Sequence, residues 1–88
     1  MPRFARKPAF VDAFRLGSND APDWLLAALE LPHDHTGAVW CGLAGRMVIA
    51  TPKGQQIAQP DDWIVRDLAG NIEAIRADLF HQLYEPAA

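Results

Sequence analysis

The C-terminal segment 59–86 constrains the fold more than any other part of this chain, because turn residues alternate there with short apolar runs. Pro60 fixes the φ angle that the first central position of a tight turn needs. The run 63–68 has apolar side chains on both of its faces, which is typical of a strand covered on two sides. Gly70 accepts a positive φ angle and predicts a hairpin that returns into a second strand over 72–76. The segment therefore predicts a pair of antiparallel strands.

A single helical turn is predicted after this hairpin, running through Leu79, Phe80 and Leu83. Asp78 is suited to cap it, because the carboxylate of an N-cap residue accepts a hydrogen bond from a free backbone N–H group. Phe80 and Tyr84 are four residues apart, a spacing that places both rings on one side of a helix. We therefore expect these two rings to cover one face of the hairpin.

A longer helix is predicted over residues 22–31. Pro22 suits the first helical position, an acidic residue occupies the first turn, and Pro32 ends the helix. The apolar residues form two adjacent rows, so a wide face is expected to pack on the sheet. These rows contain Trp24, Ala28 and Leu31, and Leu25 and Leu29.

The remaining apolar runs predict strands joined by short turns, over residues 10–16, 38–43, 46–51 and 55–59. Asp12 lies among the aromatic residues of the first run, and two explanations stay open: a place near a sheet edge, or an ion pair with Arg66 or Arg76. Strands that follow one another through short turns form an antiparallel meander. The predicted fold class is α+β, with a single helix packed on a twisted, mainly antiparallel meander sheet of about five or six short strands.

Length and composition indicate one domain over residues 1–88. The 88-residue chain is 50% hydrophobic and 22% charged, as ordinary folded domains are. Its single cysteine, Cys41, cannot form an intramolecular disulfide, and the N-terminus lacks the apolar region of a secretory signal. No apolar run approaches the ~20 residues of a transmembrane helix. We therefore expect a cytoplasmic protein without membrane contact.

Charge is unevenly distributed along the chain, although the net charge is only −3 at pH 7. A candidate basic strip near the N-terminus comprises Arg3, Arg6, Lys7 and Arg15, whereas acidic residues concentrate in the last third. Binding to a nucleic acid backbone requires clustered Lys and Arg, so the net charge argues against nucleic acid as a partner. We expect the basic and acidic sets to pair with each other or to be solvated.

Several motifs occur in a fixed order. They are Arg6-Lys7-Pro8-Ala9-Phe10-Val11-Asp12-Ala13-Phe14, Pro60-Asp61-Asp62-Trp63, Gly70, and Asp78-Leu79-Phe80-His81-Gln82-Leu83-Tyr84-Glu85-Pro86. This ordered set resembles the small phage and prophage proteins of the PGDYG family. The signature of that family is an Arg/Lys-Pro opening, Pro-Gly-Asp-aromatic before a strand, a glycine turn, a second strand and a closing Asp-X-Phe-X-X-X-Tyr-Glu-Pro. The resemblance implies a phage origin and supplies no mechanism.

The chain departs from this signature at Asp61, where the family has Gly. If this position needs a positive φ angle, Asp adopts it at a modest cost, whereas most other side chains do not. The acidic pair Asp61-Asp62 is therefore particular to this chain.

No set of residues predicts catalysis or metal binding. His33 and His35 share a loop, but a zinc site needs three or four ligands, so an exposed polar loop is the simpler interpretation. Cys41, within an apolar strand, is expected to be a small buried hydrophobe. His81 and Asp78 have the spacing of a surface pair on a helix. We expect neither an enzyme nor a cofactor.

Three tryptophans are many for so small a domain, and tryptophan is common both in cores and at interfaces. We select Trp40 as the partly exposed one, because it lies on the strand face opposite Val39 and Cys41. Together with Asp61 and Asp62 it forms the candidate protein-binding surface.

The first function hypothesis is a phage or prophage accessory protein that binds another protein without enzymatic activity. The partner would be a host or phage protein, for instance a host factor or a component of a bacterial defence system. The second hypothesis is a nucleic-acid-binding module that uses the basic strip and Arg46. The third is an enzyme that uses Asp62, His81 or Cys41. A minor virion component is a further alternative, and an open sheet edge predicts a homodimer.

Overall fold

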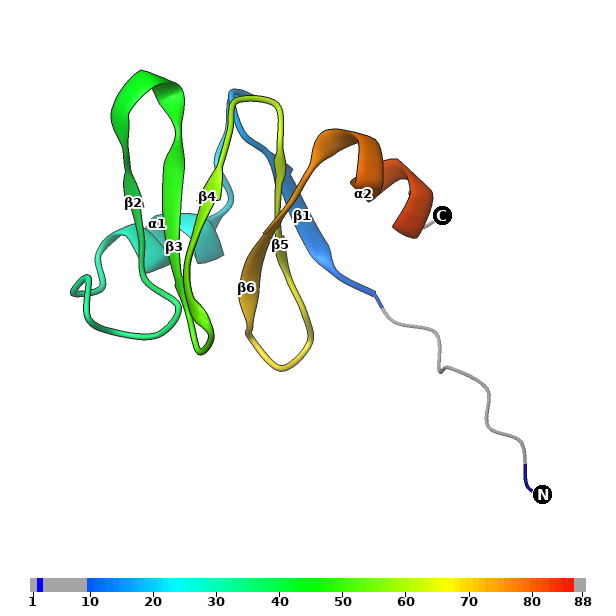
Figure 1. The fold of residues 1–88 in the computed structure, drawn as a ribbon, viewed down its shortest axis with the longest axis horizontal. Coiled ribbons are helices and arrows are strands. Elements are labelled where there is room, and N and C mark those ends of the chain that lie inside the picture. The colour runs from blue at the N-terminus through cyan, green and yellow to red at the C-terminus, as the bar shows by residue number, and fades with distance from the viewer. Residues whose placement is uncertain (1, 3–9, 87–88) are drawn as a thin grey trace.

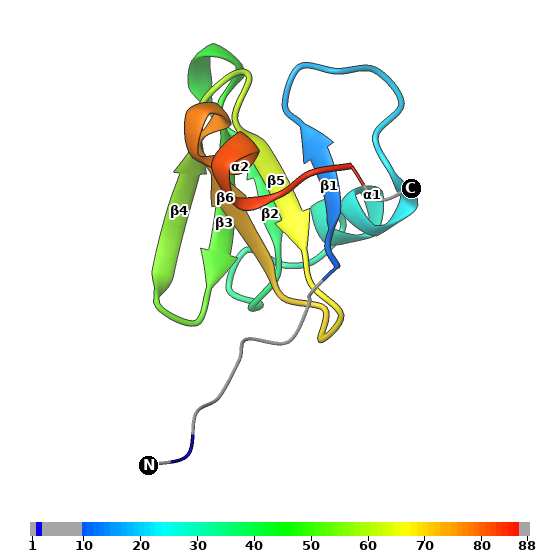
Figure 2. The same cartoon turned by 90° about the vertical axis from the view of Figure 1, so that its right-hand side faces the viewer.

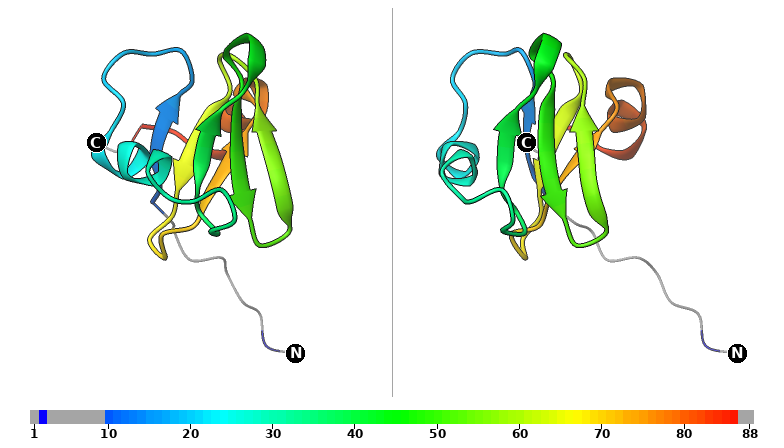
Figure 3. Two further views of the ribbon diagram at one scale, coloured as in Figure 1. Left: turned by 90° about the vertical axis from the view of Figure 1, so that its left-hand side faces the viewer. Right: turned by 60° about the vertical axis from the view of Figure 1, so that its left-hand side comes forward.

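The computed structural model describes residue 2 and residues 10–86, and this part of the chain is mixed α+β, as predicted (Figure 1). Its elements are β1 (Asp12–Arg15), α1 (Asp23–Leu29), β2 (Val39–Cys41), the 3-10 turn η1 (Leu43–Gly45), β3 (Met47–Thr51), β4 (Gly54–Ala58), β5 (Trp63–Arg66), β6 (Ile72–Ile75) and α2 (Ala77–Leu83). The two helices lie on opposite sides of the strands (Figure 3).

The strands form two antiparallel sheets of three strands each, in the orders β1-β5-β6 and β2-β3-β4. The prediction of a single helix on one meander sheet is therefore not confirmed. The chain leaves the meander at the turn between β4 and β5, where Asp61 has a φ angle of 75°. After this turn β5 pairs with β1, so the Asp62 carbonyl accepts a hydrogen bond of 2.8 Å from the Leu16 N–H.

The two sheets meet where β4 lies beside β6 (Figure 1). No backbone ladder joins these two strands. Instead, the side-chain Oε1 of Gln56 accepts a hydrogen bond of 2.9 Å from the Ala74 backbone N–H. A side-chain amide thus satisfies a backbone donor that would otherwise lack a partner.

The core lies between α1, the inner face of β2-β3-β4 and the central strand β5 (Figure 3). It is made of small and branched apolar side chains with a single Met, namely Leu25, Ala28, Val39, Met47, Ile49, Ala58 and Ile64. Burial of such groups removes apolar surface from water at roughly 25 cal/mol per Å², so this cluster is the main source of stability.

Strand β5 is covered on both faces, as predicted: Ile64 and Val65 are both buried, with 0% and 2% of their surfaces exposed. The strand is shorter than the predicted run 63–68, because the Asp67 carboxylate accepts a hydrogen bond of 2.9 Å from the Asn71 N–H and begins the turn. Leu68 is consequently 88% exposed in that turn.

Helix α1 is close to its prediction. Pro22 is its N-cap, and the helix begins at Asp23 and ends at Leu29. Leu25 and Ala28 are buried, which confirms the predicted packing face. The predicted first strand, by contrast, is shortened to β1, which leaves Phe10 outside it. 

Helix α2 differs from the single turn predicted, because it has seven residues and Arg76, rather than Asp78, is its N-cap. Asp78 lies within the first turn, where its Oδ1 accepts a hydrogen bond of 3.0 Å from the Leu79 N–H. No residue of α2 is buried. The helix therefore rests on the sheet as a surface element (Figure 2).

Candidate functional site

An aromatic stack joins α2 to the sheet. The rings of Trp63 and Phe80 are parallel to within 7° and their centroids are 4.2 Å apart. The edge of His81 meets Trp63 at 5.9 Å, and Tyr84 lies 5.4 Å from Phe80. The predicted side-by-side placement of Phe80 and Tyr84 is confirmed, and their partner on the hairpin is Trp63.

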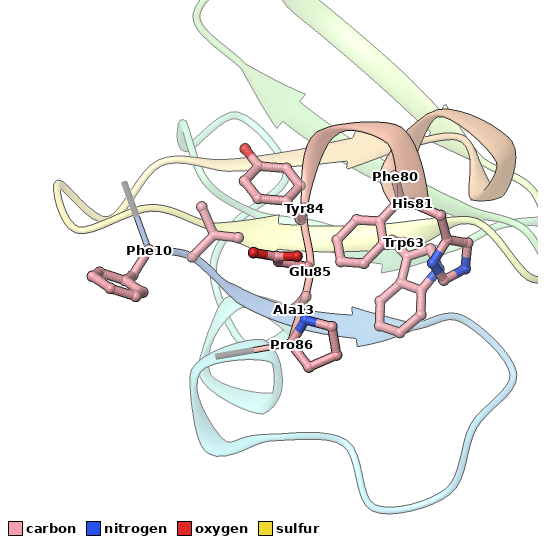
Figure 4. A pocket seen from close by; sticks show the side chains of 9 residues that line it. Phe10, Ala13, Trp63, Phe80, His81, Tyr84, Glu85 and Pro86 are labelled. Atoms are coloured by element: carbon pink, nitrogen blue, oxygen red, sulfur yellow. The ribbon is translucent and has the colours of Figure 1, made fainter. Parts of the chain in front are cut away.

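An open hollow of about 330 Å³ lies against this stack (Figure 4). It is lined by residues from both ends of the described chain: Phe10, Val11, Ala13, Trp63, Phe80, His81, Tyr84, Glu85 and Pro86. β1 and the residues before it form one wall, and α2 with the segment after it forms the other. We call this feature the aromatic hollow. Phe10 at its rim is 65% exposed in the described part of the chain.

Trp63 carries an unusual polar group in this setting. Its indole Nε1 is buried and has no hydrogen-bond acceptor among the described residues. A buried donor without a partner destabilises a fold by roughly 1–3 kcal/mol.

Two described arginines lie beside Trp63 in the strand register, and both are held by carboxylates. Arg15 pairs with Trp63 in the β1–β5 register, and its Nη2 donates to Asp61 at 3.1 Å. Arg76 donates to Asp78 at 2.9 Å. Hydrogen bonding from Arg76 lowers the pKa of Asp78, and the same hydrogen bond raises the pKa of Arg76.

Trp40 lies on the outer face of β2, opposite to buried Val39, as predicted. It is half-buried, because the ring of His33 stacks on it at 4.1 Å. In the strand register Trp40 is followed across the sheet by Val48 and Ile57, so the outer face of β2-β3-β4 has an apolar row. Ile57 is 57% exposed at its end.

Asp61 and Asp62 lie in the turn between β4 and β5. From the sequence we considered a positive φ angle at position 61, where Asp replaces the Gly of the PGDYG signature, and Asp61 has one. Its carboxylate is paired with Arg15. The Oδ2 of Asp62 accepts a hydrogen bond of 2.9 Å from the Gln59 N–H. No hydrogen bond links either carboxylate to Trp40 within the described part of the chain. Both carboxylates thus have partners of their own, Arg15 for Asp61 and the Gln59 N–H for Asp62.

The basic strip is described only at Arg15, whose pairing with Asp61 is the predicted contact between the basic and acidic sets. Arg3, Arg6 and Lys7 lie outside the described residues. Asp12 lies on the edge strand β1 and pairs with Arg66 at 2.7 Å, so both explanations given for it are confirmed. Arg46 donates to Gln59 at 2.9 Å.

The residues considered for chemistry are dispersed. Cys41 is exposed, contrary to prediction, because it is the last residue of an outer strand. His81 faces the aromatic hollow, and Asp78 pairs with Arg76 instead of with His81. Within residues 10–86, no group of three or more His, Cys, Asp or Glu side chains is placed to hold a metal ion.

The sequence did not predict the aromatic hollow. The spacing of Phe80 and Tyr84 indicated one wall, but nothing local showed that Phe10 and Pro86 would meet around Trp63. Of the described helices, neither is long and apolar enough to cross a membrane.

Comparison with known proteins gave no match to a family model, to a curated protein or to a solved structure. The resemblance to the PGDYG proteins stays a prediction.

Proposed function

We propose that the protein is a small, non-enzymatic protein-binding module whose aromatic hollow receives a large apolar side chain of a partner protein. The observation that carries this proposal is the open hollow around Trp63, with the largely exposed ring of Phe10 at its rim. Aromatic residues that line a partly formed pocket are the usual anchors of protein interfaces.

The wider role that we propose is that of a phage or prophage accessory protein, acting on a host factor or a component of a bacterial defence system. The ordered motifs at both ends of the chain support it, and several of their residues line the hollow. Phe10 belongs to the opening motif, and Phe80, Tyr84, Glu85 and Pro86 belong to the closing one. A minor virion component is the alternative role with the same binding surface.

The arrangement of the polar residues supports binding over catalysis. Of Asp62, His81 and Cys41, the residues considered for catalysis, only His81 lines the hollow, and no hydrogen bond joins it to the other two among the described residues. A general base needs such a contact with the proton that it removes or with a group that orients it. We therefore place His81 as part of the hollow wall.

The test is an affinity capture from bacterial lysate with the tagged full-length chain, with and without nuclease. The variants are Phe10→Ser, at the rim of the hollow, and the matched control Leu68→Ser, whose side chain is also largely exposed but does not line it. We expect a protein that survives nuclease, is lost with Phe10→Ser and is kept with Leu68→Ser. A third variant, Trp40→Ser, tests the outer face of β2-β3-β4: loss of the protein with this variant alone would move the binding site to the Trp40 row. Loss on nuclease treatment would favour the basic strip and nucleic acid.

A further inference from the structure

We infer that the aromatic hollow selects a partner segment in which an arginine or lysine adjoins the apolar side chain, with Glu85 as the carboxylate that receives the cation. This inference rests on the proposed function and names the chemistry of the partner.

Glu85 gives the hollow its charge. It is the one Asp, Glu, Lys or Arg among the lining residues, and Figure 4 shows its carboxylate between the walls of the hollow. No hydrogen bond or ion pair to Glu85 occurs within residues 10–86. An exposed carboxylate beside apolar rings favours a ligand that combines an apolar group with a positive charge.

The described cations near the stack do not neutralise Glu85. Arg15 lies opposite Trp63 on the neighbouring strand β1, and its guanidinium is bound by Asp61. On the other side of Trp63, its partner in β6 is Ile75. The next residue, Arg76, is bound by Asp78. Both are held at 3.1 Å or less by these other carboxylates. Among residues 10–86, no Arg or Lys is thus paired with the carboxylate in the hollow.

The same fold already holds one arginine in the way we propose. The guanidinium of Arg66 lies 5.4 Å from the ring centroid of Trp24 and donates to Asp12 at 2.7 Å. A ring and a carboxylate together thus position an arginine through a cation–π contact and a charged hydrogen bond. The hollow offers the same two kinds of group, from Phe10 or Tyr84 and from Glu85, without a cation of its own among the described lining residues.

The experiment uses two capped dipeptides, N-acetyl-leucyl-arginine amide and N-acetyl-leucyl-citrulline amide, which differ mainly in charge. Each is titrated into the 15N-labelled full-length protein while the indole N–H resonances of Trp24, Trp40 and Trp63 are followed. We expect both peptides to shift the Trp63 resonance alone. The arginine peptide should bind roughly twofold to fivefold more tightly, as for an exposed ion pair.

Glu85→Gln should remove this preference, whereas Glu30→Gln, an exposed glutamate that does not line the hollow, should keep it. Equal binding of both peptides to the wild type would overturn the inference and leave the proposed function standing. No shift of Trp63 with either peptide would overturn both. Markedly tighter binding to an Arg6→Gln/Lys7→Gln variant would overturn the inference by assigning Glu85 to the chain's own cations.

Discussion

The two helices have the same length, seven residues, and neither has a side-chain cap at its N-terminus, yet they contribute differently to the molecule. Helix α1 places Leu25 and Ala28 in the core, with 1% and 3% of their surfaces exposed. Helix α2 buries no residue and is held to the sheet by the stack of Phe80 on Trp63. 

This difference separates the part of the molecule that maintains the fold from the part that we propose binds a partner. Removing α1 from the sheet would expose the main apolar cluster, whereas α2 contributes no residue to that cluster and packs on the half-buried Trp63 through Phe80. A helix with few buried contacts is free to adjust to a ligand, because its local opening costs less than global unfolding.

The largest effect is expected from Leu25→Ala in α1. It leaves a cavity in the core and should lower the free energy of unfolding by about 2–5 kcal/mol, as core Leu→Ala changes do. The matched change Leu83→Ala in α2, where the side chain is 53% exposed, should alter the free energy of unfolding by no more than about 0.5 kcal/mol. Urea denaturation measures both. Similar losses of unfolding free energy in the two variants would contradict the conclusion that α1, and not α2, supports the core.

A smaller effect is expected from Phe80→Ala. The ring is half-buried, so the loss should be about 1–3 kcal/mol, below the value for a fully buried phenylalanine. Hydrogen exchange should show faster exchange of the α2 amides, with α1 unchanged. Equal acceleration in both helices would mean that the stack also supports the core.

The smallest effect is a pH dependence of α2. The hydrogen bond from Arg76 lowers the pKa of Asp78 below its ordinary value of 3.8, so the charged carboxylate favours the folded state. This contribution is fully present above pH 3.8 and is lost as the pH falls through the lower folded-state pKa. The protection factors of the α2 amides, which correct for the intrinsic pH dependence of amide exchange, should therefore fall over that acid range, and Asp78→Asn should weaken this pH dependence. An unchanged profile in Asp78→Asn would show that Asp78 does not stabilise the helix.

Local features of this fold could be predicted from the sequence, because they depend on neighbouring residues. The two covered faces of β5, the turn at Gly70 and the buried face of α1 all follow from periodicity and turn chemistry. The division into two sheets could not be predicted in this way. Alternation assigns each side chain to a face, but it does not say which strand lies alongside.

The candidate site shows the same limit. Trp40 was placed correctly on the outer face of its strand, yet Asp61 and Asp62 are engaged in a separate turn. The aromatic hollow depends on contacts between the two ends of the described chain, which no local pattern specifies.

The contact between Gln56 and Ala74 has a consequence for how copies of this protein can meet. Because β4 and β6 lie side by side there, each shields the other from a foreign strand, and a peptide cannot extend either sheet at that junction. Within residues 10–86, the outer strands left for such an extension are β1 and β2. The homodimer expected from the sequence would therefore join two copies through one of these two strands, at opposite ends of the paired sheets.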